Sequence, residues 1–177
     1  MPPGDTSASV TQASRETNLD LRPPSISDGN GMWTLASASG TLDVNSRYSY
    51  LLWCRDFADT SVIVTDGGDY AGFLTGYRRP DSPDTFFVWQ IAVADSHRRR
   101  GLARRMLDHV VARDGANPRF VEATVTPDNI PSTRLFESFA DANDCPMRRD
   151  ELFSERALGD GHEPEILFRI GPLHDHT

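Results

Sequence analysis

Residues 89–107 have the sequence WQIAVADSHRRRGLARRML, which begins as an apolar strand, passes through a short polar turn and continues as a helix. Amides at a helix start lack intrahelical partners and lie at the positive end of the helix dipole, so together they bind anions well. Gly101 allows an anion to approach closely. The helix prediction follows from apolar residues that recur at three-to-four spacing on one face: Leu102, Ala103, Met106, Leu107, Val110 and Val111. This stretch predicts a phosphate-binding turn between a strand and a helix.

Within it, residues 98–103 (RRRGLA) fit the Arg/Gln-x-x-Gly-x-Gly/Ala signature of the GCN5-related N-acetyltransferases, a family that the chain resembles here. In that family the loop receives the pyrophosphate of acetyl-coenzyme A. The motif alignment further implies that the backbone amide of Ile91 meets the developing oxyanion, a catalytic role, and that Val93 pairs with the pantetheine arm. The cofactor-binding residues implied are Ile91, Val93, Arg98, Arg99, Arg100, Gly101, Ala103, Arg104 and Asn129. An arginine-rich loop is also typical of a solvated surface or a nucleic-acid patch, and that alternative stays open.

Composition limits the classes of function. The chain has 177 residues, which suits one domain, and a formal net charge of −8, which argues against general nucleic-acid binding; all 18 basic residues are arginines. No apolar run approaches the ~20 residues needed to cross a bilayer, and the start lacks a secretory pattern, so we expect a cytoplasmic protein with no membrane partner. Cys54, Cys145 and the histidines lack metal-ligand spacing, so we expect neither a disulfide framework nor a metal.

Hydrophobic patterning divides the chain into three parts. Residues 1–31 are rich in small polar residues and proline and are predicted to be a disordered tail, residues 32–172 form the folded domain, and residues 173–177 are a C-terminal tail. Predicted strands cover 33–35, 61–64, 70–77, 85–93, 120–125 and 164–170, and residues 140–164 are predicted to be irregular. Predicted helices begin at 44 after an Asp43 cap, at 101, and near Pro131. This order predicts an α/β fold with a mixed sheet flanked by helices.

The same order is similar to the acetyltransferase fold over residues 32–172, and the resemblance implies that the mixed central sheet is mostly antiparallel. A second motif agrees, because residues 129–136 (NIPSTRLF) resemble the family's Asn-x-x-Ala-x-x-Leu-Tyr helix. Phe136 stands where the family usually has the tyrosine expected to reprotonate the departing thiolate. Water or another tyrosine would have to take that role here.

Further strings resemble one branch of the family, the enzymes that acetylate the 4-amino group of L-2,4-diaminobutyrate in the synthesis of the compatible solute ectoine. They are LDVNS (42–46), FADTS (57–61), GFLTGY (72–77), FVWQIAV (87–93), ATVTPDN (123–129) and HE (162–163) before LFRIGP (167–172). This resemblance implies direct amine attack on acetyl-coenzyme A, without an acyl-enzyme, and a homodimer. Another small amine, such as a polyamine, an aminoglycoside or a protein terminus, remains the alternative substrate.

The charge of diaminobutyrate, two ammonium groups and one carboxylate, calls for a pocket with acids, a planar wall and a donor. Asp43 and Glu163 are candidate ammonium partners, Trp89 a candidate wall and Asn129 a candidate donor. Each has a simpler interpretation as a helix cap, a surface acid, a core residue or a turn residue, respectively. An amine must lose a proton before it attacks, and the candidate bases are Glu163, Asp43 or a bound water.

Overall fold

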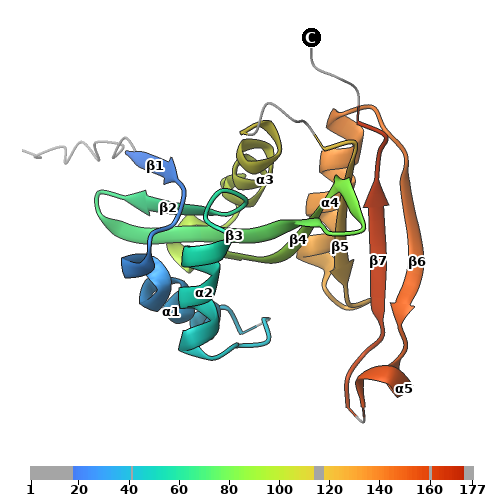
Figure 1. The fold of residues 1–177 in the computed structure, drawn as a ribbon, viewed down its shortest axis with the longest axis horizontal. Coiled ribbons are helices and arrows are strands. Elements are labelled where there is room, and N and C mark those ends of the chain that lie inside the picture. Colours follow the sequence, from blue (N-terminus) through green and yellow to red (C-terminus); the bar gives the residue numbers. More distant parts are fainter. Residues whose placement is uncertain (1–17, 41, 114–117, 160, 174–177) are drawn as a thin grey trace, which may run out of the picture.

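The structure, a computed structural model, describes residues 18–40, 42–113, 118–159 and 161–173. Its centre is a seven-stranded sheet in the order β1-β2-β3-β4-β5-β7-β6 (Figure 1). Only the β4–β5 pair is parallel among these neighbours, which confirms the predicted mixed and mostly antiparallel sheet. The strands are β1 (Leu19–Arg22), β2 (Val62–Asp66), β3 (Asp69–Arg79), β4 (Ser82–Val93), β5 (Phe120–Val125), β6 (Met147–Phe153) and β7 (Glu165–Ile170).

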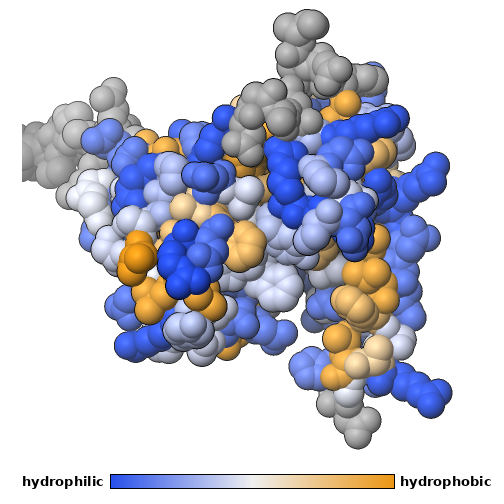
Figure 2. Space-filling model, viewed as in Figure 1, coloured by the Kyte–Doolittle hydropathy of each residue, from blue (hydrophilic) through white to orange (hydrophobic). Residues whose placement is uncertain are grey.

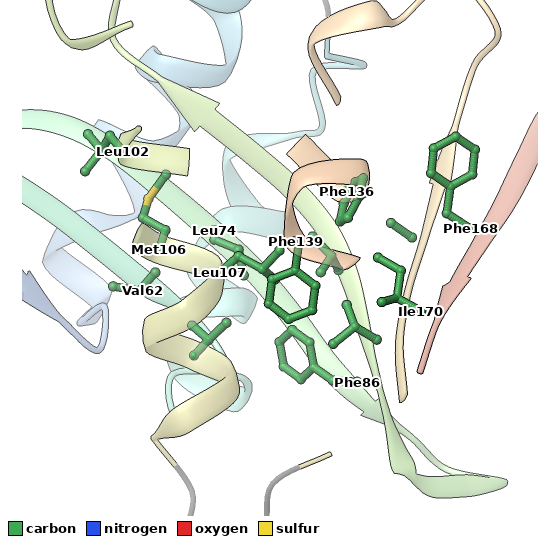
Figure 3. Packing of buried hydrophobic residues seen from close by; sticks show 14 of the residues in the cluster. Val62, Leu74, Phe86, Leu102, Met106, Leu107, Phe136, Phe139, Phe168 and Ile170 are labelled. Carbon is green, nitrogen blue, oxygen red and sulfur yellow. The ribbon is translucent and has the colours of Figure 1, made fainter. Parts of the chain in front are cut away.

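Helices cover both faces of the sheet, and each face buries its own apolar cluster. The larger cluster lies under α3 (Leu102–Ala112) and α4 (Ile130–Ala142), where Leu107, Phe139 and Phe86 point toward one another (Figure 3). The smaller cluster lies under α1 (Gly29–Ser39) and α2 (Arg47–Asp56) and contains Tyr50 and Phe73. These two layers hold β4 rigidly between them, so β4 is a firm support for a site. The short elements are η1 (Ile26–Asp28), η2 (Asp95–His97) and α5 (Glu155–Leu158).

Strand β4 has two irregularities that matter for function. Its parallel pairing with β5 runs only from Thr85 to Val88, so β4 and β5 are unpaired beyond that point. On the β3 side, Gln90 lies opposite Thr75 and Val88 lies opposite Gly76, which leaves Trp89 as an extra residue in a β-bulge. Bulges redirect side chains, and here both Trp89 and Gln90 contact α2.

The predicted disordered tail of residues 1–31 is wrong over residues 18–31, which form β1, η1 and the start of α1. An ion pair between a partly exposed arginine and a buried carboxylate orders this polar segment: both terminal nitrogens of Arg22 donate to Asp28 at 2.8 Å, and Asp28 is 2% exposed. Tyr70 on β3 also donates to Asp28, at 3.1 Å. Residues 1–17 and 174–177 lie outside the described residues, and Leu173, predicted as tail, packs against the core.

Three other local predictions are wrong. Residues 33–35 belong to α1 rather than to a strand. The helix packs closely on β3, because Gly31 lies against the Tyr70 ring, where a Cβ would be 2.2 Å from a ring carbon. Asp43 does not cap α2, because the helix begins later and Ser46 accepts from the Ser49 amide at 3.3 Å. The segment predicted as irregular, 140–164, contains the end of α4, β6 and α5. The hairpin, the long strand and the closing strand are confirmed within a few residues.

Candidate active site

A cavity of about 720 Å³ opens beside the bulge of β4. Its walls come from the loop after α1, from β4, from the end of β5 and start of α4, and from the segment between α5 and β7. The structure brings together in this cavity the four residues that the sequence suggested for substrate binding, Asp43, Trp89, Asn129 and Glu163. They come from four separate parts of the chain, so the fold assembles a site that local sequence does not contain.

The lining of the cavity is acidic. Four carboxylates contribute to it, from Asp43, Asp128, Glu163 and Glu165, and none of the described lining residues is a lysine or an arginine. An acidic concave surface concentrates cations and disfavours anionic ligands. The cavity is therefore suited to a ligand that carries ammonium groups.

Two of these acids interact directly. The neighbouring Asp128 carboxyl, through a hydrogen bond, raises the pKa of Glu163 above its ordinary value. The pKa of Asp128 is lowered, chiefly by the Thr126 hydroxyl, which donates to it at 2.8 Å, and then by Glu163. Glu163 is thus a stronger base than an isolated glutamate, which suits it to accept a proton from a substrate.

Trp89 forms an aromatic wall. Its side chain is 49% exposed, and its ring stacks on Trp53 of α2 with the centroids 6.2 Å apart and an interplanar angle of 28°. Trp53 also contacts Phe57 and Tyr77, so a row of rings supports the indole. A supported, half-exposed indole is suited to bind a cation over its face.

Asn129 is oriented by its role as a helix cap. Its side-chain oxygen accepts from the Ser132 amide at 3.1 Å at the start of α4. Because the oxygen serves the helix, the amide nitrogen is the end of the side chain left to donate to a ligand in the cavity.

Two N–H groups of β4, those of Ile91 and Val93, face the opening between β4 and β5. The Ala94 N–H donates to Ala71 on β3 at 2.9 Å, and N–H groups alternate in direction along a strand. The N–H groups of Ile91 and Val93 therefore point away from β3, toward the side where β5 has separated. Two N–H donors spaced in this way match the acceptors of an extended acyl-pantetheine chain. One of the two donors would then lie at the thioester carbonyl.

The turn before α3 has the geometry that anion binding requires. Gly101 is the N-cap with φ +72°, and nothing lies within 4 Å of where a Cβ would be. Arg99 also has a positive φ, 60°, so the turn is wound tightly. Arg99 and Arg100 are exposed, and Ala103 lies in the first helical turn. The open space, the unpaired helix amides and the two cations suit a diphosphate.

Two of the predicted arginines have partners within the protein. Arg98 pairs with Asp95 at 3.0 Å and reaches the Ser39 carbonyl at 3.3 Å, and Arg104 bonds Asp108 at 2.7 Å and the Ser138 carbonyl of α4 at 2.8 Å. These side chains fix the turn and the α3–α4 contact. His97 bonds Asp66 at 3.0 Å rather than extending into solvent.

Sequence reasoning missed several lining residues, notably Gln90 and Asp128. A signal was present for each: Gln90 is a polar residue in an apolar strand, and Asp128 directly precedes the predicted donor Asn129. Phe136, where the family motif has tyrosine, is 3% exposed and packs edge-on against Phe168, so it belongs to the core.

Two kinds of feature were not found in the described parts of the chain. No cluster of three or more His, Cys, Asp or Glu residues there is placed to hold a metal ion. None of the helices described is both long and apolar enough to span a membrane.

Comparison with known proteins places these features in context. The sequence model of the Acetyltransferase (GNAT) family matches residues 31–140. The chain is 50% identical over 163 residues to the L-2,4-diaminobutyric acid acetyltransferase of Streptomyces coelicolor, covering 89% of this chain and 95% of that protein. It is 43% identical over 168 residues to the protein of the same name from Chromohalobacter salexigens, covering 94% and 88% of the two chains.

A solved structure agrees with these sequences. The diaminobutyrate acetyltransferase EctA from Paenibacillus lautus, determined in complex with its substrate L-2,4-diaminobutyric acid and coenzyme A, is similar with a TM-score of 0.86 and 40% identity. The match covers 91% of this chain and 99% of that one. Ard1 from Thermoplasma volcanium, at 17% identity and a TM-score of 0.68 over 86% of this chain and 97% of its own, shares the fold.

Proposed function

Since the chain belongs to the Acetyltransferase (GNAT) family, we propose that it transfers the acetyl group of acetyl-coenzyme A to the 4-amino group of L-2,4-diaminobutyrate. The observation that carries the proposal is the acidic cavity, which gathers Asp43, Trp89, Asn129 and Glu163 beside the opening of β4. The high identity to diaminobutyrate acetyltransferases over most of both chains supports this substrate over other amines.

The acetyl donor fits the side of β4 that faces β5. Its diphosphate would lie on the amides at the start of α3, next to Gly101, Ala103, Arg99 and Arg100. Its pantetheine arm would pair with the Val93 N–H in the gap left by β5, which brings the thioester to the Ile91 N–H. Arg98 and Arg104 contribute by holding the turn and α3 in place.

Diaminobutyrate fits the acidic cavity. Asp43 and Glu163 neutralise its ammonium groups, the Trp89 ring forms a wall beside the thioester, and the Asn129 amide donates to an oxygen of either substrate. The substrate reaches the thioester through the gap at the bulge, so both reactants are held at once and no acyl-enzyme is needed.

The chemical step begins with removal of a proton from the 4-ammonium group. Glu163, whose pKa is raised by Asp128, accepts this proton directly or through a water. The free amine then attacks the thioester carbonyl carbon, and the negative charge that develops on the carbonyl oxygen is stabilised by the Ile91 N–H. The carbon–sulfur bond breaks, the nitrogen releases its second proton to solvent to give the neutral amide, and the thiolate of coenzyme A takes a proton from solvent, because Phe136 offers none.

The test is identification of the product by NMR after incubation of the purified protein with acetyl-coenzyme A and L-2,4-diaminobutyrate. We expect N4-acetyl-L-2,4-diaminobutyrate as the only acetylated product. Release of free thiol with spermidine but not with diaminobutyrate would overturn the substrate assignment, and acetylation at the 2-amino group would overturn the position.

The biological setting follows from the substrate. We place the reaction in ectoine synthesis, hence in osmoadaptation, and in the cytoplasm, where acetyl-coenzyme A is made and used. We also propose a homodimer. Its support is the arm formed by β6 and α5, which ends the sheet and exposes Leu152, Phe153 and Leu158 (Figure 2).

A further inference from the structure

Gln90 is a polar residue in the apolar middle of β4, and only 7% of it is exposed. Its side-chain oxygen accepts a hydrogen bond from the Tyr50 hydroxyl at 3.1 Å. Its side-chain nitrogen donates to the backbone carbonyl of Asp43 at 2.9 Å. One amide thus joins β4 to α2 and to the loop between α1 and α2.

Tyr50 extends this network to a second loop residue. It is fully buried, and burial raises the pKa of its hydroxyl, while the neighbouring Asn45 and Gln90 act in the opposite direction. Both Asp43 and Asn45 line the acidic cavity. The buried pair of Gln90 and Tyr50 therefore holds the loop through the hydrogen bond from Gln90 to the Asp43 carbonyl, with the Tyr50 hydroxyl beside Asn45.

The bulge explains why Gln90 is able to do this. In a regular strand, consecutive side chains point to opposite faces, but the extra residue at Trp89 turns both Trp89 and Gln90 toward α2. Trp89 forms one wall of the cavity and Gln90 anchors the loop that forms another. The position of the Asp43 loop relative to the Trp89 ring is thus set by two adjacent residues of one rigid strand.

The fold itself gives no reason for an amide at this position. A buried amide must have its hydrogen bonds satisfied, at a cost in desolvation, and an unbranched apolar side chain of similar size would fill the same space. The hydrogen bonds that Gln90 makes are to the loop and to the tyrosine that also holds the loop.

From this geometry we infer that Gln90 is a positioning residue for the amine substrate: with Tyr50 it holds the loop of residues 42–46 so that the Asp43 carboxylate meets an ammonium group beside Trp89. This inference rests on the proposed function for the identity of the amine. It does not extend to the acetyl donor, whose contacts lie on the other side of β4.

The test compares Gln90→Met with Tyr50→Phe. The second variant removes a single hydroxyl and is the smaller disturbance to the packing. Thr85→Val is the matched control, because Thr85 is a fully buried polar residue of the same strand that bonds Asp84 rather than the loop. We expect the KM for diaminobutyrate to rise about tenfold in Gln90→Met and roughly threefold in Tyr50→Phe, with the KM for acetyl-coenzyme A within about twofold of the parent. Thr85→Val keeps both KM values.

A double-mutant cycle separates positioning from direct contact. If Gln90 acts through Asp43, Gln90→Met adds little to the KM increase caused by Asp43→Asn, because the group being positioned is already gone. Full additivity of the two changes would overturn the inference.

Amide hydrogen exchange gives a second measurement that needs no substrate. In Gln90→Met and Tyr50→Phe we expect faster exchange over residues 42–46, with α3 and α4 unchanged. Unchanged exchange in this loop, or faster exchange throughout the protein with both KM values raised, would overturn the inference. Failure of the parent enzyme to acetylate diaminobutyrate would overturn the proposed function instead, and exchange in the loop would still decide whether Gln90 positions it.

Discussion

At the scale of single residues, the Gly101 backbone is central to the proposed coenzyme site. Its φ of +72° is a conformation that side chains other than asparagine and aspartate rarely adopt, and the space in front of it is open. Bulk or negative charge here would occupy the position that we propose for the diphosphate.

We therefore expect Gly101→Glu to abolish coenzyme A binding measured by isothermal titration calorimetry. The matched control is Gly101→Asn, which tolerates this backbone conformation and adds no charge, and which we expect to keep part of the affinity. Unaltered affinity in Gly101→Glu would show that the diphosphate binds elsewhere.

Glu163 gives a prediction about pH. A base must be deprotonated to act, so kcat/KM falls on the acidic side as Glu163 gains its proton. Asp128→Asn removes the neighbour that raises the pKa of Glu163, so that pKa falls and the acidic limb of the profile moves to lower pH. Glu151→Gln, an exposed acid on β6, serves as the control. An acidic limb at the same pH in Asp128→Asn would exclude Glu163 as the titrating base.

The identities of the site residues were more predictable than the hydrogen bonds that hold them in place. Asp43, Trp89, Asn129 and Glu163 were predictable because motif strings and substrate charge both indicated them, and the structure places all four at one cavity. Gln90 stands out as a polar residue in an apolar strand, but its role was not predictable, because that role depends on a bulge that changes the direction of one side chain, and no local pattern in the sequence reveals the register shift.

At the scale of elements, patterning succeeded where apolar residues decide the structure. The strands at 85–93 and 120–125 and the helix after Gly101 were predictable from period and breakers alone. Patterning failed where polar contacts determine the structure. The ion pair of Arg22 and Asp28 holds β1 and η1 in place. Strand β6 is exposed along most of its length and is ordered by its pairing with β7. Composition and hydrophobic periodicity do not reveal such contacts.

The Arg22–Asp28 pair predicts how stability depends on pH. The Arg22 guanidinium holds the pKa of Asp28 well below its usual range, so the pair stabilises the fold above the unfolded pKa of about 4, and this contribution is lost as the pH falls through the folded value. Asp28→Asn should lower the free energy of unfolding by roughly 1–2 kcal/mol at pH 7, since solvent reaches Arg22 and weakens the pair.

Urea denaturation at pH 7 and near pH 3 checks this, with the difference between Asp28→Asn and the parent expected to shrink at the lower pH. Asp56→Asn, which breaks an exposed pair with Arg55, is the control and should leave stability unchanged. An equal difference at both pH values would mean that Asp28 acts through something other than its charge.

At the scale of the whole molecule, the arm of β6 and α5 predicts the oligomeric state. Leu152 and Phe153 are 44% and 48% exposed, and Leu158 nearby is 38% exposed (Figure 2). Phe153→Glu should convert the proposed dimer to a monomer in sedimentation equilibrium, while Ile26→Glu, at an exposed apolar residue on η1, should leave it a dimer. A monomeric parent protein would contradict the proposal.

The exposed Arg99 and Arg100 beside the α3 turn have one chemical consequence for a protein that handles an activated acyl group. An exposed lysine that loses its proton can be acylated by acetyl-coenzyme A in solution, whereas a guanidinium stays protonated and is not a nucleophile. With arginine at every one of its 18 basic positions, the chain offers no side-chain amine for self-modification. The exposed arginines beside the α3 turn therefore stay chemically intact in the presence of acetyl-coenzyme A, and Arg99→Lys should slowly accumulate an acetyl group that the parent does not gain there.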